Sequence, residues 1–132
     1  MIALDTSILA RYILNDNPSE ASAAGQLISG NDCSISWSVL VELCWVLESN
    51  ARLPRSAVAS SLASLADSDF IAVPHDALLT WAIDRYASGA DFPDMVHLAS
   101  AMSGATEFAC FDRKLARQAG TDPPIPVRTL RA

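Results

Sequence analysis

The stretch Met1-Ile2-Ala3-Leu4-Asp5-Thr6-Ser7 decides how the rest of the chain is interpreted. Mostly apolar residues lead to an acid and two hydroxyl side chains, a pattern typical of a short buried strand that ends at the edge of a sheet. Open α/β sheets bind their ligands at the carboxyl edge of their strands. The sequence therefore predicts that Asp5 lies at such an edge, and other acids that arrive there become candidate partners.

Short apolar segments alternate with longer segments that have helical periodicity. Strands are predicted at residues 1–4, 33–36, 70–73 and 108–111, with a possible last strand at Val127. Helices are predicted at residues 8–13, 18–29, 37–50, 54–66, 75–88, 91–102 and 113–119. This alternation predicts an α/β fold with a mostly parallel central sheet of four to five strands and helices on both faces.

The length and composition predict a single domain, residues 1–132. Hydrophobic residues make up 51% of the chain and charged residues 18%, which excludes a disordered tail and allows the chain to bury a core of its own. We find no signal-peptide pattern and no stretch near the ~20 apolar residues of a membrane span. We therefore expect a cytoplasmic protein without a membrane partner.

The three cysteines, Cys33, Cys44 and Cys110, stand singly in apolar surroundings. An odd number without paired spacing argues against disulfides and against a zinc site, so we expect small core side chains in a reducing compartment. The net charge of −6 disfavours a nucleic-acid partner when it is considered alone. The position of the 15 acids matters more than their sum.

Four acids are placed so that they arrive at the same edge of the predicted sheet. Asp5 and Asp112 each follow an apolar strand and precede a helix, so both project from the carboxyl edge if the strands are parallel. Asp94 starts the helix that leads into the strand before Asp112, and Glu42 lies about one turn into the helix after the second strand. The pattern predicts that all four face one pocket.

Each acid also has a structural interpretation. Asp is a favoured helix cap, and Asp91-x-x-Asp94 resembles a capping box with a shorter acid. Glu42 forms a narrow solvated stripe with Ser38 and Ser49. Both interpretations stay open for any acid taken alone, and the functional one depends on the four acids occurring together.

Four carboxylates in one pocket raise one another's pKa, and a hard cation stabilises such a cluster. Mg²⁺ and Mn²⁺ prefer oxygen ligands, usually a few carboxylates with water and substrate phosphate. A cation held in this way lowers the pKa of a bound water and polarises a phosphoryl group. The chemistry that this cluster indicates is hydrolysis of a phosphodiester by a metal-activated water.

Four segments, in this order, resemble the motifs of PIN-domain proteins: Asp5-Thr6-Ser7, SWSVLVELCWVL at 36–47, ADFPDMVHLA at 90–99 and FDRKLA at 111–116. Their order, their spacing and the chain length resemble the VapC toxins of bacterial and archaeal toxin–antitoxin pairs, and the resemblance covers essentially the whole chain. It implies a three-layer α/β/α sandwich and a Mg²⁺- or Mn²⁺-dependent endoribonuclease.

The resemblance also implies roles for individual residues. Asp5, Glu42, Asp94 and Asp112 match the acidic quartet that binds metal and carries catalysis, and Asp91 matches an accessory acid. Thr6 and Ser7 match positions whose hydroxyl supports the first Asp, whereas Cys110 departs from the Thr or Ser found in relatives. The implied partners are an RNA substrate, a second copy of the chain in a homodimer, and a small VapB-like antitoxin whose tail blocks the acidic pocket.

Several residues near these acids keep two interpretations. Arg113, Lys114 and Arg117 are predicted either to contact RNA phosphates or to form a solvated helix face. His97 is either a structural histidine, which we favour, or part of the pocket rim. The three tryptophans are expected in the core or at a dimer contact: Trp37, Trp45 and Trp81.

Two other classes of protein compete with a ribonuclease. A PIN-like fold without turnover would act as a protein-binding module, but a structural role does not require four acids at one edge. A phosphoryl-transfer protein of receiver or phosphatase type also places Asp at strand ends with Mg²⁺. That class usually has a lysine at a strand end, which fits poorly with Lys114 at a helix start.

Overall fold

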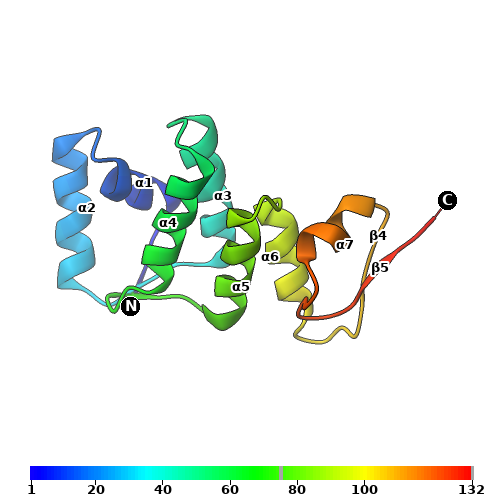
Figure 1. Ribbon diagram of the computed structural model, residues 1–132. Coiled ribbons are helices and arrows are strands. Elements are labelled where there is room, and N and C mark those ends of the chain that lie inside the picture. The colour runs from blue at the N-terminus through cyan, green and yellow to red at the C-terminus, as the bar shows by residue number, and fades with distance from the viewer. Residues whose placement is uncertain (75, 132) are drawn as a thin grey trace. The chain divides into compact units, whose positions relative to one another are not determined.

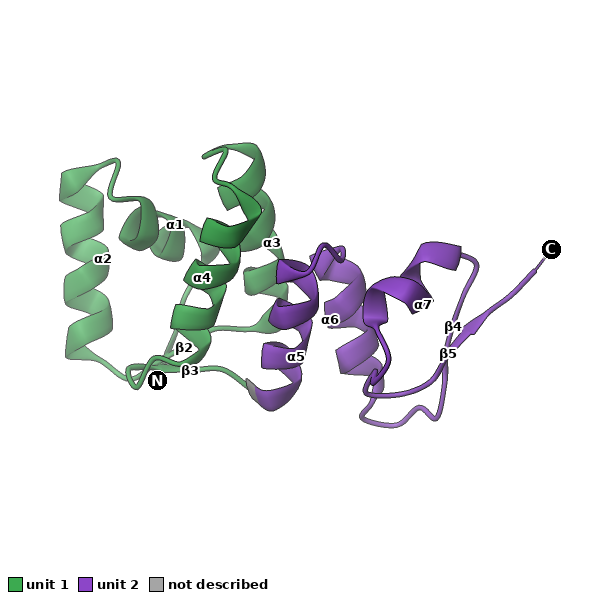
Figure 2. Cartoon of the chain, in the orientation of Figure 1, with its two compact units in different colours: residues 1–76 green, residues 77–132 purple. Residues whose placement is uncertain are grey.

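A computed structural model of the chain describes residues 1–74 and 76–131, and one or two helices separate successive strands along it (Figure 1). The chain divides into two compact units, residues 1–76 and residues 77–132, called unit 1 and unit 2 below (Figure 2). The elements are β1 (Ile2–Ala3), α1 (Thr6–Leu14), α2 (Pro18–Gly30), β2 (Cys33–Ser34), α3 (Trp37–Ser49), α4 (Arg55–Ala66), β3 (Ile71–Ala72), α5 (Asp76–Ala87), α6 (Phe92–Ala101), β4 (Phe108–Cys110), α7 (Arg113–Ala119) and β5 (Val127–Thr129).

Unit 1 contains a parallel sheet in the order β1-β2-β3. Cys33 pairs with Ile2 on one side and with Ile71 on the other. The Leu4 amide extends the pairing by donating to the Ser34 carbonyl over 2.9 Å. Because the strands run the same way, the residue that follows β1 and the helix that follows β2 lie at the same edge of this sheet. That edge carries Asp5 and the start of α3.

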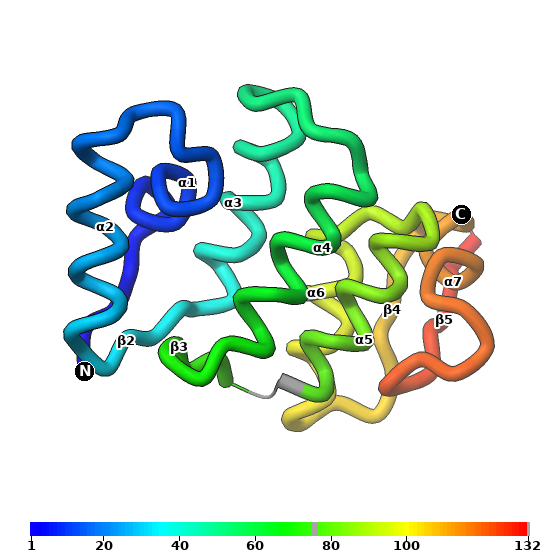
Figure 3. The backbone as a smooth tube through the Cα atoms, turned by 60° about the vertical axis from the view of Figure 1, so that its left-hand side comes forward, coloured from blue at the N-terminus to red at the C-terminus, as the bar shows by residue number. Residues whose placement is uncertain are grey.

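The helices of unit 1 bury a leucine-rich core. Helix α1 packs against α2 and α3, and α3 packs against α4; Figure 3 shows α1 and α2 side by side. Apolar residues recur in α3 at helical spacing, which presents one face to the interior. The fully buried side chains of this unit include Leu9, Ile35, Leu40, Leu43, Leu47, Val58 and Leu62.

Unit 2 contains the parallel pair β4-β5, in which Phe108 lies opposite Val127. Helix α7 packs against β5. The rings of Tyr86 and Phe92 meet edge to face with their centroids 5.7 Å apart, and both side chains are fully buried. This contact anchors the first residue of α6 and so the helix start at which Asp91 and Asp94 lie.

The predicted α/β class with parallel strands is confirmed. The five strands of the described residues lie in a three-stranded and a two-stranded sheet, one in each unit. The strands are two or three residues long, and the segment predicted at 70–73 is reduced to Ile71–Ala72, with Phe70 outside it and 64% exposed. Helix α5 was predicted from His75, which lies outside the described residues. The single domain stays a prediction.

One expectation about core residues needs correction, and a second is narrowed to one of its alternatives. Cys33 and Cys44 are buried as expected, but Cys110, at the end of β4 in a two-stranded sheet, is only half-buried. Trp45 is 59% exposed, since it lies on the face of α3 away from the buried leucines, so the core is excluded for it and the dimer contact stays a prediction. Trp37 and Trp81 are partly buried, and the Trp37 indole donates to the Pro74 carbonyl over 2.7 Å.

No helix within residues 1–74 and 76–131 is long and apolar enough to cross a membrane.

Candidate functional site

Asp5 caps α1 and lies in extended backbone conformation just after β1. Its Oδ2 accepts hydrogen bonds from the Ser7 hydroxyl over 2.7 Å and from the Ser7 amide over 3.3 Å. These bonds, the hydroxyl first, lower the pKa of Asp5, and the Thr6 amide adds to the effect. Asp5 is therefore an exposed carboxylate that is ionised at neutral pH and held in place by its own helix.

Asp5 and Glu42 line the same groove, which has a volume of about 390 Å³ and lies between α1 and α3. Glu42 is exposed, as are Ser38 and Ser49, so the solvated stripe on α3 exists and its acid also faces the groove. The other lining residues are Thr6, Ser7, Ala10, Arg11, Leu14, Asp16, Val46, Asn50 and Ala51. The structure thus brings together two of the four predicted acids in unit 1.

The Thr6 hydroxyl is an orphaned polar group in the wall of this groove. Thr6 is 5% exposed, and its Oγ1 has no hydrogen-bond partner among the described residues. A buried hydroxyl without a partner is uncommon, because it loses its hydrogen bonds to water on folding and gains none in the protein. The Thr6 hydroxyl is itself buried, so the oxygen atoms that the groove offers to a divalent cation are the carboxylates of Asp5 and Glu42.

Sequence patterns missed the basic residue of the groove, Arg11. Its guanidinium bonds to Asp16 over 3.0 Å and to Glu20, and these two acids raise the pKa of Arg11. A spacing of five residues is not a helical pairing, so no pattern predicted the contact with Asp16. The turn at Asn15, whose φ of 51° is left-handed, brings Asp16 back toward α1. Arg11 therefore clamps α1 to α2 and leaves the groove negative.

In unit 2, Asp91 and Asp112 both lie within electrostatic reach of Asp94. Asp91 caps α6, and its Oδ2 accepts the Asp94 amide over 3.0 Å. Burial raises the pKa of Asp94; the charge and hydrogen bonding of Asp91 and the charge of Asp112 raise it further, and His97 opposes them. Asp94 is thus a half-buried acid in crowded negative surroundings, which a cation would relieve.

Asp112 caps α7 by accepting the Lys114 amide over 2.8 Å. Cys110 replaces the Thr or Ser that the resemblance leads us to expect at this position. Its thiol donates a hydrogen bond to the Asp112 carbonyl, with the sulfur and oxygen 3.5 Å apart. The sulfur therefore contacts the backbone of the acid and leaves the Asp112 carboxylate free for other contacts.

Gln118 is a second residue that the sequence patterns missed. Its side-chain Oε1 accepts the Asp91 amide over 3.2 Å, and its carbonyl accepts Arg85 Nε over 2.7 Å. In a capping box, that amide would bind the acid three residues later, which is Asp94. Only the fold reveals that a glutamine from another helix takes this place.

The structure therefore brings the predicted acids together as two groups, Asp5 with Glu42 in unit 1 and Asp94 with Asp91 and Asp112 in unit 2. No three His, Cys, Asp or Glu side chains form a ready-made metal site within the described part of the chain. The donors in both groups are carboxylate oxygens, which suit Mg²⁺ or Mn²⁺ better than Zn²⁺.

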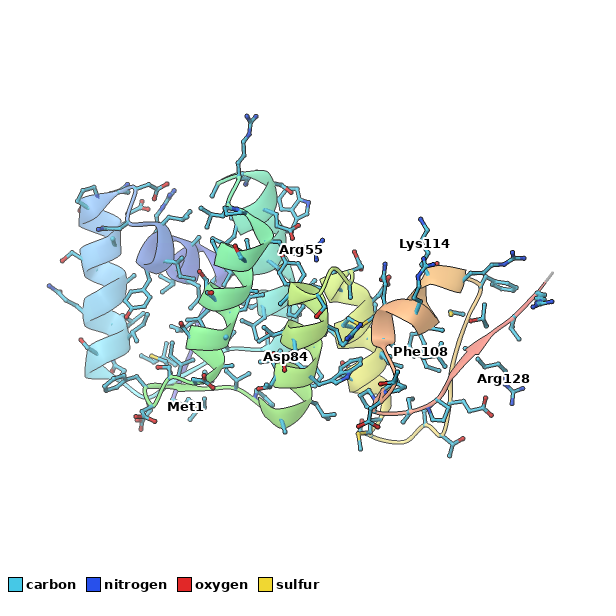
Figure 4. The ribbon with its side chains drawn as sticks, viewed as in Figure 1. Met1, Arg55, Asp84, Phe108, Lys114 and Arg128 are labelled. Carbon is cyan, nitrogen blue, oxygen red and sulfur yellow. The ribbon has the colours of Figure 1, made fainter. Side chains whose placement is uncertain are left out.

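The basic residues around Asp112 are on the surface. Arg113, Lys114 and Arg117 are exposed, and none of them forms an ion pair with another described residue. Figure 4 shows Lys114 extending away from α7. His97 is also exposed and lies close enough to Asp94 to affect its pKa, which places it beside this acid group.

Comparison with known proteins identifies the family. A family model described as PIN domain matches residues 2–121. No curated protein and no solved structure shows significant similarity to the chain. PIN domains are generally nucleases and typically use a divalent metal ion. Because the match covers nearly the whole chain and includes both acid groups, this protein belongs to the PIN domain family.

Proposed function

We propose that the protein is a Mg²⁺- or Mn²⁺-dependent endoribonuclease that acts in the cytoplasm as the VapC-type toxin of a toxin–antitoxin pair. Asp5, Glu42, Asp94 and Asp112 serve one reaction, the hydrolysis of an RNA phosphodiester. The expected products carry a 5′-phosphate and a 3′-hydroxyl. Membership of a family of nucleases supports the reaction class, and the motif resemblance supports the toxin role.

The observation that carries the proposal is the groove shared by Asp5 and Glu42. Asp5 caps α1 and Glu42 lies in α3, so the two carboxylates reach the groove from different elements. Helix capping explains Asp5, but it does not explain a second acid on α3 that lines the same groove. A site for an oxygen-liganded cation accounts for both acids.

Each acid contributes in its own way. Asp5 is ionised and oriented by Ser7, so it offers a carboxylate without prior proton loss. Asp94 gains most from a nearby positive charge, because burial and Asp91 hold its pKa above the ordinary value. When bound, a divalent cation supplies Lewis-acid stabilisation of the phosphoryl oxygens and lowers the pKa of a water.

The exposed cations near Asp112 support RNA as the substrate. Arg113, Lys114 and Arg117 add three positive charges within a seven-residue helix of a chain whose net charge is −6. Free cations of this kind attract phosphates along a strand, whereas Arg11 is already neutralised by two acids. We therefore propose that α7 contacts the RNA backbone.

The proposed protein partners are a second copy of the chain and a small VapB-like antitoxin. Exposed aromatic side chains support a protein partner, since Trp45, Phe70 and Phe111 are 59%, 64% and 69% exposed. Light scattering of the purified chain is expected to give the mass of a homodimer.

The test of the proposed function is cleavage of RNA by the purified protein with Mg²⁺ or Mn²⁺, with and without a chelator. Asp5→Asn keeps the size of the side chain and is expected to lower cleavage by about 100-fold or more, because metal-assisted charge stabilisation is worth several kcal/mol. The matched control is Asp32→Asn, an exposed acid of unit 1 outside the groove, which is expected to keep full activity.

Cleavage that resists the chelator, or full activity of Asp5→Asn, would contradict the proposed mechanism. Absence of both cation binding and cleavage of any RNA would favour the protein-binding module instead. A stable phosphoryl adduct on Asp5 after incubation with a phosphoryl donor would favour the phosphoryl-transfer class.

A further inference from the structure

Gln118 occupies a position in unit 2 that links three helices. Its side chain accepts the backbone amide of Asp91, the cap of α6, while its own carbonyl near the end of α7 accepts Arg85 Nε from α5. Asp112 caps the other end of α7. One residue therefore connects the start of α6, with Asp91 and Asp94, to the helix that begins at Asp112.

The hydrogen bond from the Asp91 amide to Gln118 changes the role of Asp94 in the cap of α6. Asp94 stands three residues after the cap, where an acid normally turns back to accept the amide of the cap residue. Here the Asp91 carboxylate still accepts the Asp94 amide over 3.0 Å, but the reciprocal acceptor is Gln118 Oε1. The Asp94 carboxylate is thereby released from capping its own helix.

The position of Gln118 is itself restrained. Arg85 lies so close to Gly120 that a Cβ there would come within 3.0 Å of Cζ and 3.2 Å of Nη1, and Gly120 has a φ of +81° that other residues rarely adopt. Arg85 thus packs against the end of α7 from the side while its Nε holds the Gln118 carbonyl. The backbone of Gln118 is therefore held where its side chain reaches the Asp91 amide.

We infer that Gln118 is a positioning residue, which replaces Asp94 in the cap of α6 and so keeps that carboxylate available for a divalent cation. The inference rests on the proposed metal-dependent function and adds a residue that no motif marks. Groups that orient metal ligands typically affect metal affinity 10–100-fold when they are removed. Without the Gln118 oxygen, Asp94 becomes the nearest acceptor in sequence for the Asp91 amide.

The experiment measures binding of Mn²⁺ alone by electron paramagnetic resonance, together with thermal unfolding. Gln118→Met keeps the length of the side chain and removes the acceptor, and we expect about tenfold weaker Mn²⁺ binding. Gln118→Asn keeps the amide but does not reach Asp91, and we expect the same loss from a second, polar variant. Gln118→Glu keeps an ε oxygen for the Asp91 amide and is expected to retain binding.

The matched control is Gln26→Met, because Gln26 is exposed on α2 and is the other glutamine of the chain. It is expected to bind Mn²⁺ like the unchanged protein. If Gln118→Met and Gln118→Asn are less heat-stable but bind Mn²⁺ unchanged below their transitions, Gln118 is only a structural contact and the inference is overturned. If the unchanged protein binds no Mn²⁺, the proposed metal site itself is contradicted, and the inference about Gln118 is overturned with it.

Discussion

At the scale of single residues, two acids of the same type have opposite environments. Ser7 hydrogen bonds lower the pKa of Asp5, whereas burial and the neighbouring Asp91 raise the pKa of Asp94. Each shift has a local cause within its own unit, hydrogen bonding for Asp5 and burial for Asp94. In the proposed metal site, Asp5 would bind a cation without first losing a proton, and a cation near Asp94 would stabilise its ionised form.

The raised pKa of Asp94 predicts how Asp94→Asn changes stability with pH. The folded state binds the Asp94 proton more tightly than the unfolded state does, so this group favours folding below its unfolded pKa. That contribution is lost as pH rises through the folded pKa. We expect Asp94→Asn to be more stable than the unchanged protein at pH 7 by about 0.5 kcal/mol, a small value because the group is partly solvated.

Urea unfolding at pH 7 and near pH 3 checks this prediction in the absence of divalent cations. The gain is expected to disappear at the lower pH, where the carboxyl group is protonated in both states. Asp122→Asn, at an exposed acid of the same unit, is the control and is expected to change little. An Asp94→Asn protein that is less stable at pH 7 would show that the charged form makes a favourable contact instead.

At the scale of elements, helix caps account for the placement of the acids. Asp5, Asp91 and Asp112 cap α1, α6 and α7. Capping and ligand binding are compatible roles, because a cap holds a carboxylate at the start of a helix that follows a strand or loop at the carboxyl edge. The helix start therefore orients the acid as well as satisfying its own amide groups.

The exposed face of α7 predicts a salt-dependent contact with RNA. In an Asp5→Asn background, which prevents cleavage, we expect Lys114→Gln with Arg117→Gln to weaken RNA binding at low salt. The slope of log K against log salt should fall by about 1.4, since each phosphate contact with a single strand contributes about 0.7.

Fluorescence anisotropy with a labelled RNA measures these slopes. The control carries the same change of charge at two other exposed arginines, Arg52→Gln with Arg131→Gln, and is expected to keep the slope of the parent. Equal slopes for the two double variants would mean that α7 is only a solvated face.

At the scale of the whole molecule, the sequence predicts one domain, and the structure describes two compact units. We predict that the chain unfolds in a single transition, because neither unit has more than 76 residues and small domains have marginal cores. Differential scanning calorimetry is expected to give equal calorimetric and van't Hoff enthalpies. Two separate transitions, with and without chelator, would show that the units unfold independently.

The sequence by itself determined the features that depend on neighbours along the chain. The bounds of α7 at 113–119 were predicted without error, and α2 and α3 were predicted to within one residue. The parallel α/β class followed from the alternation of elements. Caps, stop signals and helical periodicity are local properties, so a single sequence carries them.

The tertiary structure alone decided which side chains meet. The groove joins Asp5 to Glu42, the clamp joins Arg11 to Asp16, and Gln118 reaches the Asp91 amide from another helix. Contacts of this kind join residues whose spacing fits neither the helical nor the strand period, so no sequence pattern marks them. The sequence therefore predicted the acids as candidate site residues. The residues that contact these acids or their backbone, such as Gln118, were identified only from the packing of the helices.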